Sequence, residues 1–261
     1  MNGPILSIIT VNFNNNLGLL KTLESVSSQS FSSYEHIIID AGSTDGSRET
    51  IIQYEKENPH LSFWSSEPDK GIYDGMNKGI DHAKGQYLYF LNSGDCLSQD
   101  ILAKIPFDGT EYLYGDTILF YKRKTKKRVY PDTLDLIYLS DNRYDINYKI
   151  ISDWAHCFQC LIIENRTYRH LPYIISECDG RGISSNGKEL NQERTLWFQN
   201  TFPATQSKVF IDCAALDRSG FRDIIHILAN THKFKKRMKT LILFLYEINN
   251  LFSYKHKRIK N

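Results

Sequence analysis

The sequence has no run of about 18 uninterrupted apolar residues, so we expect no transmembrane helix. It also lacks a basic N-terminal segment followed by an apolar run and a small-residue cleavage site, so we expect no secretory leader. Repeats and low-complexity segments are missing too. With 41% hydrophobic and 24% charged residues, the 261-residue chain is typical of a globular protein with a full core. Its length suits one α/β domain with an appendage, or two small domains.

Cysteine is scarce and follows no regular frame. The chain has five cysteines: Cys96, Cys157, Cys160, Cys178 and Cys213. Cys157 and Cys160 have a metal-like spacing, but no second pair partners them, and residues three apart also share one face of a helix. We interpret them as structural thiols, with a metal or redox role as the alternative. A reducing, cytoplasmic setting is the default.

Positive charge gathers in the last part of the chain. From Lys233 to Asn261, nine Lys or Arg stand against one acid, Glu247, around the apolar residues 241–246. A basic amphipathic helix of this kind suits an anionic membrane surface. The alternative is a helix packed on the body of the protein. We expect no nucleic-acid partner, because the rest of the chain is net acidic and carries no reading motif.

Up to Asp95 the sequence alternates short apolar runs with helical patterns. The predicted strands cover residues 5–11, 35–40, 61–65 and 86–91. Helices are expected after Asn14 and from Ser47, each with that residue as its cap, and over residues 73–83. Alternating strands and helices imply right-handed crossovers and a mostly parallel sheet.

After Asp95 the pattern changes. Residues 111–122 and 127–130 predict an antiparallel hairpin whose turn is a run of Lys and Arg. Helices are predicted over about 133–139 and from Ser152 to about Glu164. Beyond Gly187 the sequence is typical of a mainly helical segment.

Polar residues follow three of the predicted strands, at the edge where an open parallel sheet binds ligands. Asp40, before a glycine-bearing loop, could hold a ribose hydroxyl or a base edge. Asp95 could offer oxygen to a divalent cation that neutralises a diphosphate. Taken alone, each of these segments could equally be an ordinary turn or helix cap.

Four segments, ITVNFN, IIIDAGSTDGS, SEPDKGIYDGMNKGI and GQYLYFLNSGD, together resemble family 2 glycosyltransferases. The likeness is closest to the bacterial subgroup that assembles surface polysaccharides. It covers about residues 4–97 and recurs at 151–154 and 182–185. It implies a GT-A type α/β fold: a mostly parallel sheet flanked by helices, a small antiparallel element and a helical C-terminal extension.

The resemblance also implies domains and a donor site. A GT-A domain would cover residues 1–232, with a nucleotide-binding half at about 1–97 and an acceptor half at about 98–232. The basic amphipathic helix would cover 233–261. The matching donor-site residues are Thr10, Asn12 and Asp40 around the base and ribose, Asp45 supporting that loop, and Asp69 and Asn77 lining the pocket, with Lys70 and Tyr73 nearby.

Metal and catalytic roles follow from the same likeness. Asp95 matches the final, metal-coordinating acid of the family's Asp-x-Asp signature, with Ser93 in place of the first acid, which implies a manganese or magnesium ion. Asp153 matches the general base. The chain would then be an inverting glycosyltransferase that moves a sugar from a nucleoside-diphosphate donor, with a preference for uridine. The acceptor would be a saccharide or a lipid-linked saccharide of the cell surface, and the enzyme cytoplasmic or peripheral at the inner membrane face.

The sequence departs from the family in one place. Relatives carry a longer segment with a Cys-His-Gln motif before the Ser-Asp-Trp block, whereas only Ser140–Ile150 intervene here. This implies an internal deletion, a different acceptor site or a damaged enzyme. A catalytically degenerate sugar-nucleotide binding protein is therefore the alternative. A nucleotidyltransferase would need a glycine-rich, basic loop after the first strand, and residues 12–16 have no such character.

Overall fold

The computed structural model describes residues 3–121, 124–128, 136–138, 143–179, 187–204 and 206–208. The chain divides into two compact units, Met1–Arg194 and Thr195–Asn261. The predicted boundary after residue 232 and the basic tail lie outside the described residues. No helix in the described part of the chain is long and apolar enough to cross a membrane.

Strands and helices alternate through the N-terminal part, as predicted. They are β1 (Leu6–Asn12), α1 (Asn16–Ser27), β2 (Tyr34–Asp40), α2 (Ser47–Glu57), β3 (Leu61–Ser66), α3 (Ile72–His82) and β4 (Tyr87–Phe90). β1 pairs in parallel with β2 and β4, and β2 pairs in parallel with β3. The strand order is therefore β3-β2-β1-β4, and the predicted parallel sheet is confirmed.

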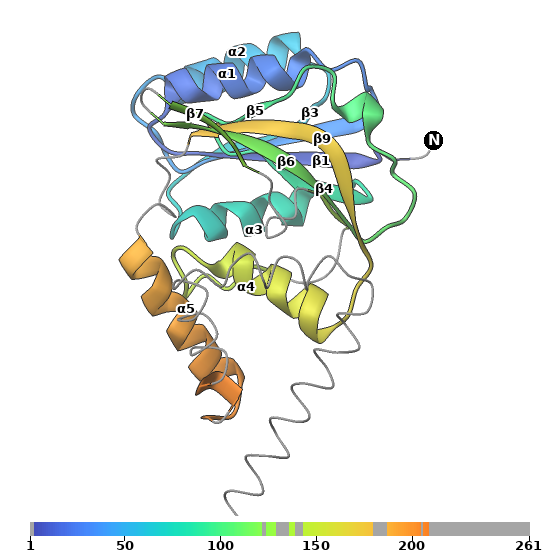
Figure 1. Cartoon of the computed structure of the whole chain (residues 1–261). Coiled ribbons are helices and arrows are strands. Elements are labelled where there is room, and N and C mark those ends of the chain that lie inside the picture. The colour runs from blue at the N-terminus through green and yellow to red at the C-terminus, as the bar shows by residue number, and fades with distance from the viewer. Residues whose placement is uncertain are drawn as a thin grey trace, which may run out of the picture. The chain divides into compact units, whose positions relative to one another are not determined.

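Helices cover both faces of this sheet: α1 and α2 lie on one face and α3 on the other (Figure 1). The side chains of β1 alternate between the two layers, as the pleat of a strand requires. Leu6 and Ile8 pack with Val26 of α1, whereas Ile9 and Val11 pack with α3. Every residue of β1 and β2 is buried, which explains why the middle of each strand is rich in isoleucine and why their polar side chains are hydrogen-bonded within the protein.

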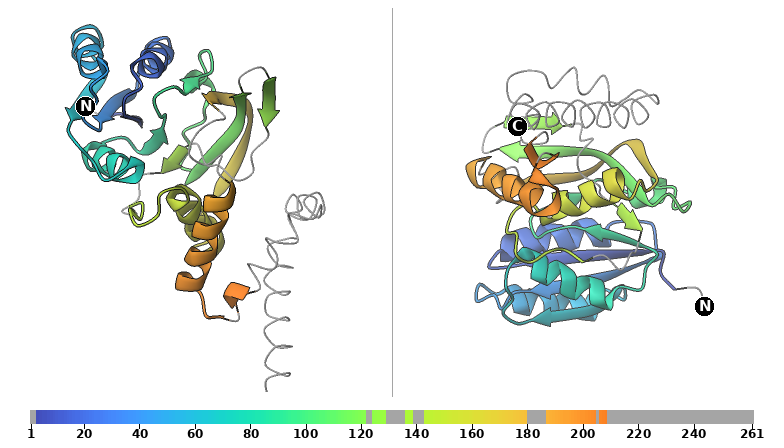
Figure 2. Two further views of the ribbon diagram at one scale, coloured as in Figure 1. Left: turned by 90° about the vertical axis from the view of Figure 1, so that its left-hand side faces the viewer. Right: turned by 90° about the horizontal axis from the view of Figure 1, so that it is seen from below.

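The second part of the unit widens the same sheet. Its elements are β5 (Cys96–Leu97), η1 (Leu102–Lys104), β6 (Tyr112–Tyr121), β7 (Lys124–Arg128), β8 (Leu136–Tyr138), α4 (Ser152–Phe158), η2 (Gln159–Ile163), β9 (Tyr168–Asp179) and the first part of α5 (Gly187–Thr201), a helix that continues past Arg194 into the second unit. The order continues from β4 as β8-β6-β9-β5, with β7 on β6. β6 and β9 run side by side and parallel (Figure 2).

Several predictions for this part are confirmed. β6 and β7 form the expected antiparallel hairpin, although β7 already begins at Lys124, inside the basic run that was predicted as the turn. The helix expected from Ser152 is present as α4, continued by the π-helical η2. α5 begins at Gly187 as expected. The short β5 and the long β9 were not predicted.

The helix predicted over residues 133–139 is wrong for its described part. Leu136–Tyr138 form β8, which pairs antiparallel with β4 on one side and β6 on the other. Pairing on both sides satisfies the backbone of a segment whose local pattern is equally compatible with a helix.

Both predicted helix caps were off by one residue. Asn15 caps α1, and its Oδ1 accepts from Gly18 N at 3.2 Å. Asn14 has φ 46° and instead accepts from Thr44 N at 2.9 Å, so its amide bridges two loops. Ser47 is the first residue of α2, not its cap, and Gly46 takes the cap position with φ 92°.

Candidate functional site

The loops that follow β1, β2 and β4 are joined to one another by hydrogen bonds. Asn15 Nδ2 donates to Ser93 O at 2.9 Å, which ties the start of α1 to the loop after β4. Asn14 N donates to Ser43 Oγ at 2.8 Å, which ties the loop after β1 to the loop after β2. The polar segments picked from the sequence therefore come together at the carboxyl edge of the sheet, where open α/β sheets bind ligands.

Asp40 is a fully buried carboxylate at the end of β2. Its oxygens accept from Asn12 Nδ2 at 2.7 Å, Ser66 Oγ at 2.6 Å, Ser43 N at 2.9 Å and Ser43 Oγ at 2.5 Å. Burial acts to raise the pKa of Asp40, but the bonds from Ser43, Ser66 and Asn12 outweigh it, and the pKa lies below its usual value. Asp40 is thus a charged anchor for the loop after β2.

Asn12, at the end of β1, keeps one oxygen without a partner. Its Nδ2 donates to Asp40 Oδ1 and, at 3.2 Å, to Ser43 Oγ. Its Oδ1 is buried and accepts no hydrogen bond from the described residues. A buried acceptor left unsatisfied costs about 1–3 kcal/mol, so this oxygen is suited to a ligand N–H.

Thr10 lies inside the sheet and not at its edge. It is fully buried, and its Oγ1 is hydrogen-bonded to His36 Nε2 at 2.9 Å. Burial lowers the pKa of His36 to about 3, so the imidazole is neutral. Thr10 therefore links β1 to β2, and its predicted contact with the nucleotide stays a prediction.

Asp45 is exposed and joins the first turns of two helices. Its carboxylate accepts from Asn16 N at 2.7 Å and from Ser47 N and Oγ at 3.2 and 2.6 Å. The bond from the Ser47 hydroxyl is the main cause that lowers the pKa of Asp45. The loops that flank the site lead into α1 and α2. By joining the first turns of these helices, Asp45 supports the site.

Asp69 and Asn77 both interact within the protein. Asp69 Oδ1 accepts from Gly71 N at 2.9 Å just before α3. Asn77 Nδ2 donates to Tyr144 O at 2.8 Å, and Asn77 Oδ1 accepts from Tyr144 N at 2.9 Å. Asn77 thereby fixes the short segment that precedes α4, and its predicted role in the donor pocket stays a prediction.

The loop that carries Ser93 and Asp95 is anchored on α1. Thr22 Oγ1 donates to Asp95 O at 2.7 Å and accepts from Gly94 N at 2.9 Å. Asn92, three residues before Asp95, has a buried Oδ1 that accepts no hydrogen bond from the described residues.

The residues of this loop fit a magnesium or manganese ion bound through one protein carboxylate. Within the described ranges no group of three or more His, Cys, Asp or Glu could enclose a metal. Such ions commonly bind through one or two carboxylates and complete their shell with phosphate oxygens and waters. Asp95 would supply the carboxylate.

Asp153 lies in the first turn of α4. Its side chain is reached by solvent, yet protein atoms surround the carboxylate, and burial raises its pKa. Tyr73 OH donates to Oδ1 at 2.9 Å, and Trp154 N donates to the same atom at 2.7 Å. These bonds and the charge of Arg194 act against burial without cancelling it. Both of these bonds are made to Oδ1, so Oδ2 is the oxygen that can accept a proton.

Tyr144 was missed at the level of sequence. It comes from the short connection before α4, is 7% exposed, and its ring lies 5.5 Å from Tyr73, 5.3 Å from Phe90 and 5.4 Å from His156, between centroids. The signal in the sequence that could have indicated Tyr144 is an aromatic residue inside an unusually short connection.

Cys160 is fully buried, with Sγ 3.8 Å from His156 Nε2. A thiol enclosed in this way favours the structural interpretation of the cysteines.

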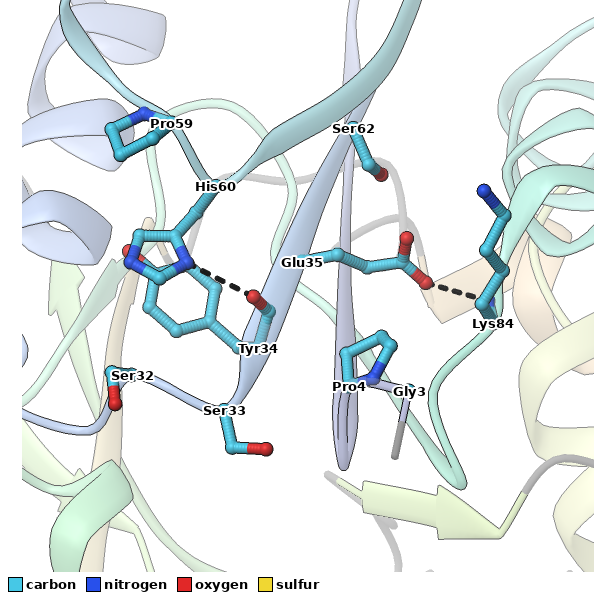
Figure 3. A pocket seen from close by; sticks show the side chains of 10 residues that line it. All are labelled: Gly3, Pro4, Ser32, Ser33, Tyr34, Glu35, Pro59, His60, Ser62 and Lys84. Carbon is cyan, nitrogen blue, oxygen red and sulfur yellow. Dashed lines mark hydrogen bonds between the residues drawn. The ribbon is translucent and has the colours of Figure 1, made fainter. Parts of the chain in front are cut away.

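A recess of about 400 Å³ lies at the opposite edge of the sheet (Figure 3). Tyr34 begins β2, and His60 directly precedes β3; the His60 ring stacks on Tyr34 at 4.2 Å between centroids. Glu35 accepts from Ser7 Oγ at 2.7 Å. This recess is at the amino ends of the strands and is separate from the candidate site.

The model of the family described as "Glycosyl transferase family 2" matches residues 7–160 of this chain. The chain belongs to glycosyl transferase family 2. An uncharacterized glycosyltransferase of Mycobacterium tuberculosis is 43% identical over 103 residues, which cover 39% of this chain and 38% of that protein. A PGL/p-HBAD biosynthesis glycosyltransferase of Mycobacterium bovis is 26% identical over 211 residues, covering 71% of this chain and 81% of the relative. The aligned part is thus well under half the length of the first relative.

Solved structures show the fold of this glycosyl transferase family 2 member. TarS 1–349 of S. aureus, in complex with UDP-GlcNAc, superposes with a TM-score of 0.62 at 14% identity, covering 79% of this chain and 70% of the TarS 1–349 chain. The mannosyltransferase PcManGT of Pyrobaculum calidifontis, in complex with GDP-Man and Mn²⁺, gives a TM-score of 0.58 at 13% identity, with 96% and 88% covered. The GT-A type fold class is confirmed.

Proposed function

We propose that this protein is an inverting glycosyltransferase that moves a sugar from a nucleoside-diphosphate donor to a hydroxyl group of a saccharide or lipid-linked acceptor in surface polysaccharide synthesis. The observation that carries the proposal is the state of Asp153. Its carboxylate has a raised pKa, is held at Oδ1 and is available at Oδ2. Tyr73, which holds it, lies in the first turn of α3, just after the carboxyl end of β3.

In the reaction, Asp153 Oδ2 takes the proton of the acceptor hydroxyl while the hydroxyl oxygen bonds to the anomeric carbon. The bond from that carbon to the diphosphate oxygen breaks, and the electron pair leaves with the nucleoside diphosphate. Attack from the side opposite the leaving group inverts the anomeric centre. Asp95 would hold the divalent cation that, when bound, offsets the charge of the diphosphate.

The donor's base would lie beside Asn12. Its unpartnered Oδ1 is suited to accept from the imide N–H of a uracil, so we propose a UDP-linked donor. Asp40 would act indirectly by fixing Asn12 and Ser43, so nucleoside binding should depend on this residue.

The test is a donor panel on the full-length protein with Mn²⁺. Binding of UDP-sugars and GDP-mannose is measured by calorimetry, and turnover by release of the nucleoside diphosphate. Binding together with release supports the enzyme. Binding without release in both the wild type and Asp153→Asn would favour the degenerate binding protein, for which the short connection before α4 is the supporting observation.

For the basic segment 233–261, which lies outside the described residues, we propose contact with the anionic inner face of a membrane. Full-length protein should sediment with phosphatidylglycerol vesicles at low salt, and less at high salt. A chain truncated after His232 should stay in the supernatant. Equal sedimentation of both forms would remove this role.

A further inference from the structure

We propose that Tyr73 is a positioning residue for Asp153: it holds Oδ1 of the carboxylate and thereby directs Oδ2 to the acceptor hydroxyl. The inference rests on the proposed role of Asp153 as the base. It adds to that role the group that orients the base and connects it to the donor side of the site.

The geometry restrains the carboxylate at one oxygen. Tyr73 and Asp153 are 80 residues apart in sequence, and their bond of 2.9 Å joins α3 to α4. Trp154 N donates to the same oxygen. A carboxylate that receives two donors on Oδ1 cannot rotate without losing both bonds, so Oδ2 keeps a fixed direction.

The phenol of Tyr73 is itself held in place. The side chain is 5% exposed and packs against Tyr144. The backbone of Tyr144 is fixed by the amide oxygen and nitrogen of Asn77, about one turn further along α3. The connection continues to Lys149 and Ile150, whose N–H groups donate to the two oxygens of Glu193 at 2.9 and 2.8 Å. Tyr73 therefore packs against a connection that is itself held by hydrogen bonds to α3 and α5.

The charges and burial around Asp153 favour a hydrogen bond that Tyr73 donates and Asp153 accepts. The groups that face Asp153 are Tyr73 from α3, Tyr144 from the connection and Arg194 from α5. Burial and the nearby charge of Asp153 raise the pKa of Tyr73, so its hydroxyl stays protonated and donates. The donated bond lowers the pKa of Asp153 against the opposing effect of burial. Without it, the carboxylate would both turn and hold its proton to higher pH.

The link also connects donor and acceptor chemistry. Tyr73 follows, by four residues, Asp69, whose carboxylate shapes the turn into α3. A donor bound at the carboxyl edge of β3 would thus rest on the same helical turn that orients the base.

The first experiment measures the carboxyl group directly. Full-length protein labelled with ¹³C at the aspartate carboxyl carbons is titrated by NMR, and the Asp153 signal is identified by its loss in Asp153→Asn. Tyr73→Phe should raise the pKa of Asp153 by about one unit, as expected for loss of a hydrogen bond to a charged group. Tyr87→Phe removes another buried hydroxyl, which accepts from Gly109 N and is not among the groups that shift the pKa of Asp153, so that pKa should stay unchanged. An unchanged Asp153 pKa in Tyr73→Phe overturns the inference.

The second experiment follows UDP release from UDP-N-acetylglucosamine with Mn²⁺. Tyr73→Phe should lower kcat about tenfold with little change in the donor KM, and should move the acidic limb of the pH profile upward. In an Asp153→Asn background the same change should have no further effect on kcat. A persistent, equal loss in that background would assign Tyr73 a merely structural role. If Asp153→Asn releases UDP as fast as the wild type, the proposed base fails, while the NMR result still decides the Tyr73 contact.

Discussion

The side-chain amide of Asn77 pairs with the backbone of Tyr144 as one strand residue pairs with another. Its Nδ2 donates to Tyr144 O and its Oδ1 accepts from Tyr144 N, at 2.8 and 2.9 Å. The described part of the short connection before α4, residues 143–150, is therefore fixed on α3 at Tyr144. Such pairing gives no support to the interpretation of this short segment as the mark of a damaged enzyme.

Asn77→Ala should remove both bonds and loosen residues 143–150. We expect a loss of about 1–3 kcal/mol in the free energy of unfolding, since two backbone groups lose their partners. The Tyr144 amide should also exchange its hydrogen faster. Denaturant unfolding and hydrogen exchange check this. Lys78→Ala removes a half-buried neighbour on the same helix, with its ion pair to Asp74 and its bond to Pro68 O; it is the control and should cost much less. Unaltered exchange at Tyr144 would contradict the assignment.

Asp153→Asn should lower kcat by about 10² to 10⁴ while donor affinity stays nearly unchanged, as expected for loss of a general base. In the wild type, activity should fall as pH drops through the raised pKa of Asp153.

The same substitution makes a prediction for stability. A carboxyl group whose folded-state pKa is raised destabilises the folded state above that pKa, and this cost vanishes as pH falls. Asp153→Asn should therefore melt at the wild-type temperature or slightly above it at neutral pH. A clear drop in the melting temperature with full turnover would instead assign Asp153 to stabilising the start of α4.

Asp95→Ala should leave the fold intact and weaken donor binding in Mn²⁺. The physical reason is the charge of the diphosphate, which needs a cation held at the edge of β4. Calorimetry with UDP, with and without chelator, measures the effect. Asp108→Ala removes an exposed aspartate that pairs with Arg169 elsewhere and should bind UDP like the wild type. Equal affinity of Asp95→Ala and wild type in both conditions would remove the metal role.

Asp40→Asn should weaken the binding of UDP and of the full donor alike, and should also change the acid stability of the fold. The folded-state pKa of Asp40 is lowered, so its contribution to stability is present above the unfolded pKa and is lost as pH falls through the folded pKa. Unfolding free energies measured from neutral pH down to below pH 4 should therefore fall less steeply in Asp40→Asn than in the wild type. A parallel pH dependence would show that Asp40 is not charged in the folded protein.

The parallel half of the sheet could be predicted because its signals are local. β1 and β2 are buried on both faces, and their apolar runs, flanked by glycine-bearing loops, allow few other structures. The second half, with its mixed parallel and antiparallel pairs, depends on pairing with distant segments. β8 is three residues long and is a strand only because β4 and β6 lie on either side of it.

The site shows the same division. Position after a strand was enough to predict that Asn12, Asp40 and Asp95 would gather at one edge. It could not predict that Asp40 would accept hydrogen bonds from Ser43 and Ser66, or that Tyr73 would donate one to Asp153. Those contacts depend on side-chain directions set by packing between α3, α4 and the connection, which no spacing in the sequence encodes.

The short pairing of β8 with β4 and β6 has a mechanical consequence. Among the residues that the structure describes, β1 and β2 face each other over seven pairs, whereas β8 meets β4 over three and β6 over two. Hydrogen bonds across a sheet share a load applied along it, so a shorter ladder yields at a smaller force. If the two ends of the sheet were pulled apart, for instance in an optical trap, the molecule would first open along β8. The block that holds Asn12 and Asp40 would still be folded when it did.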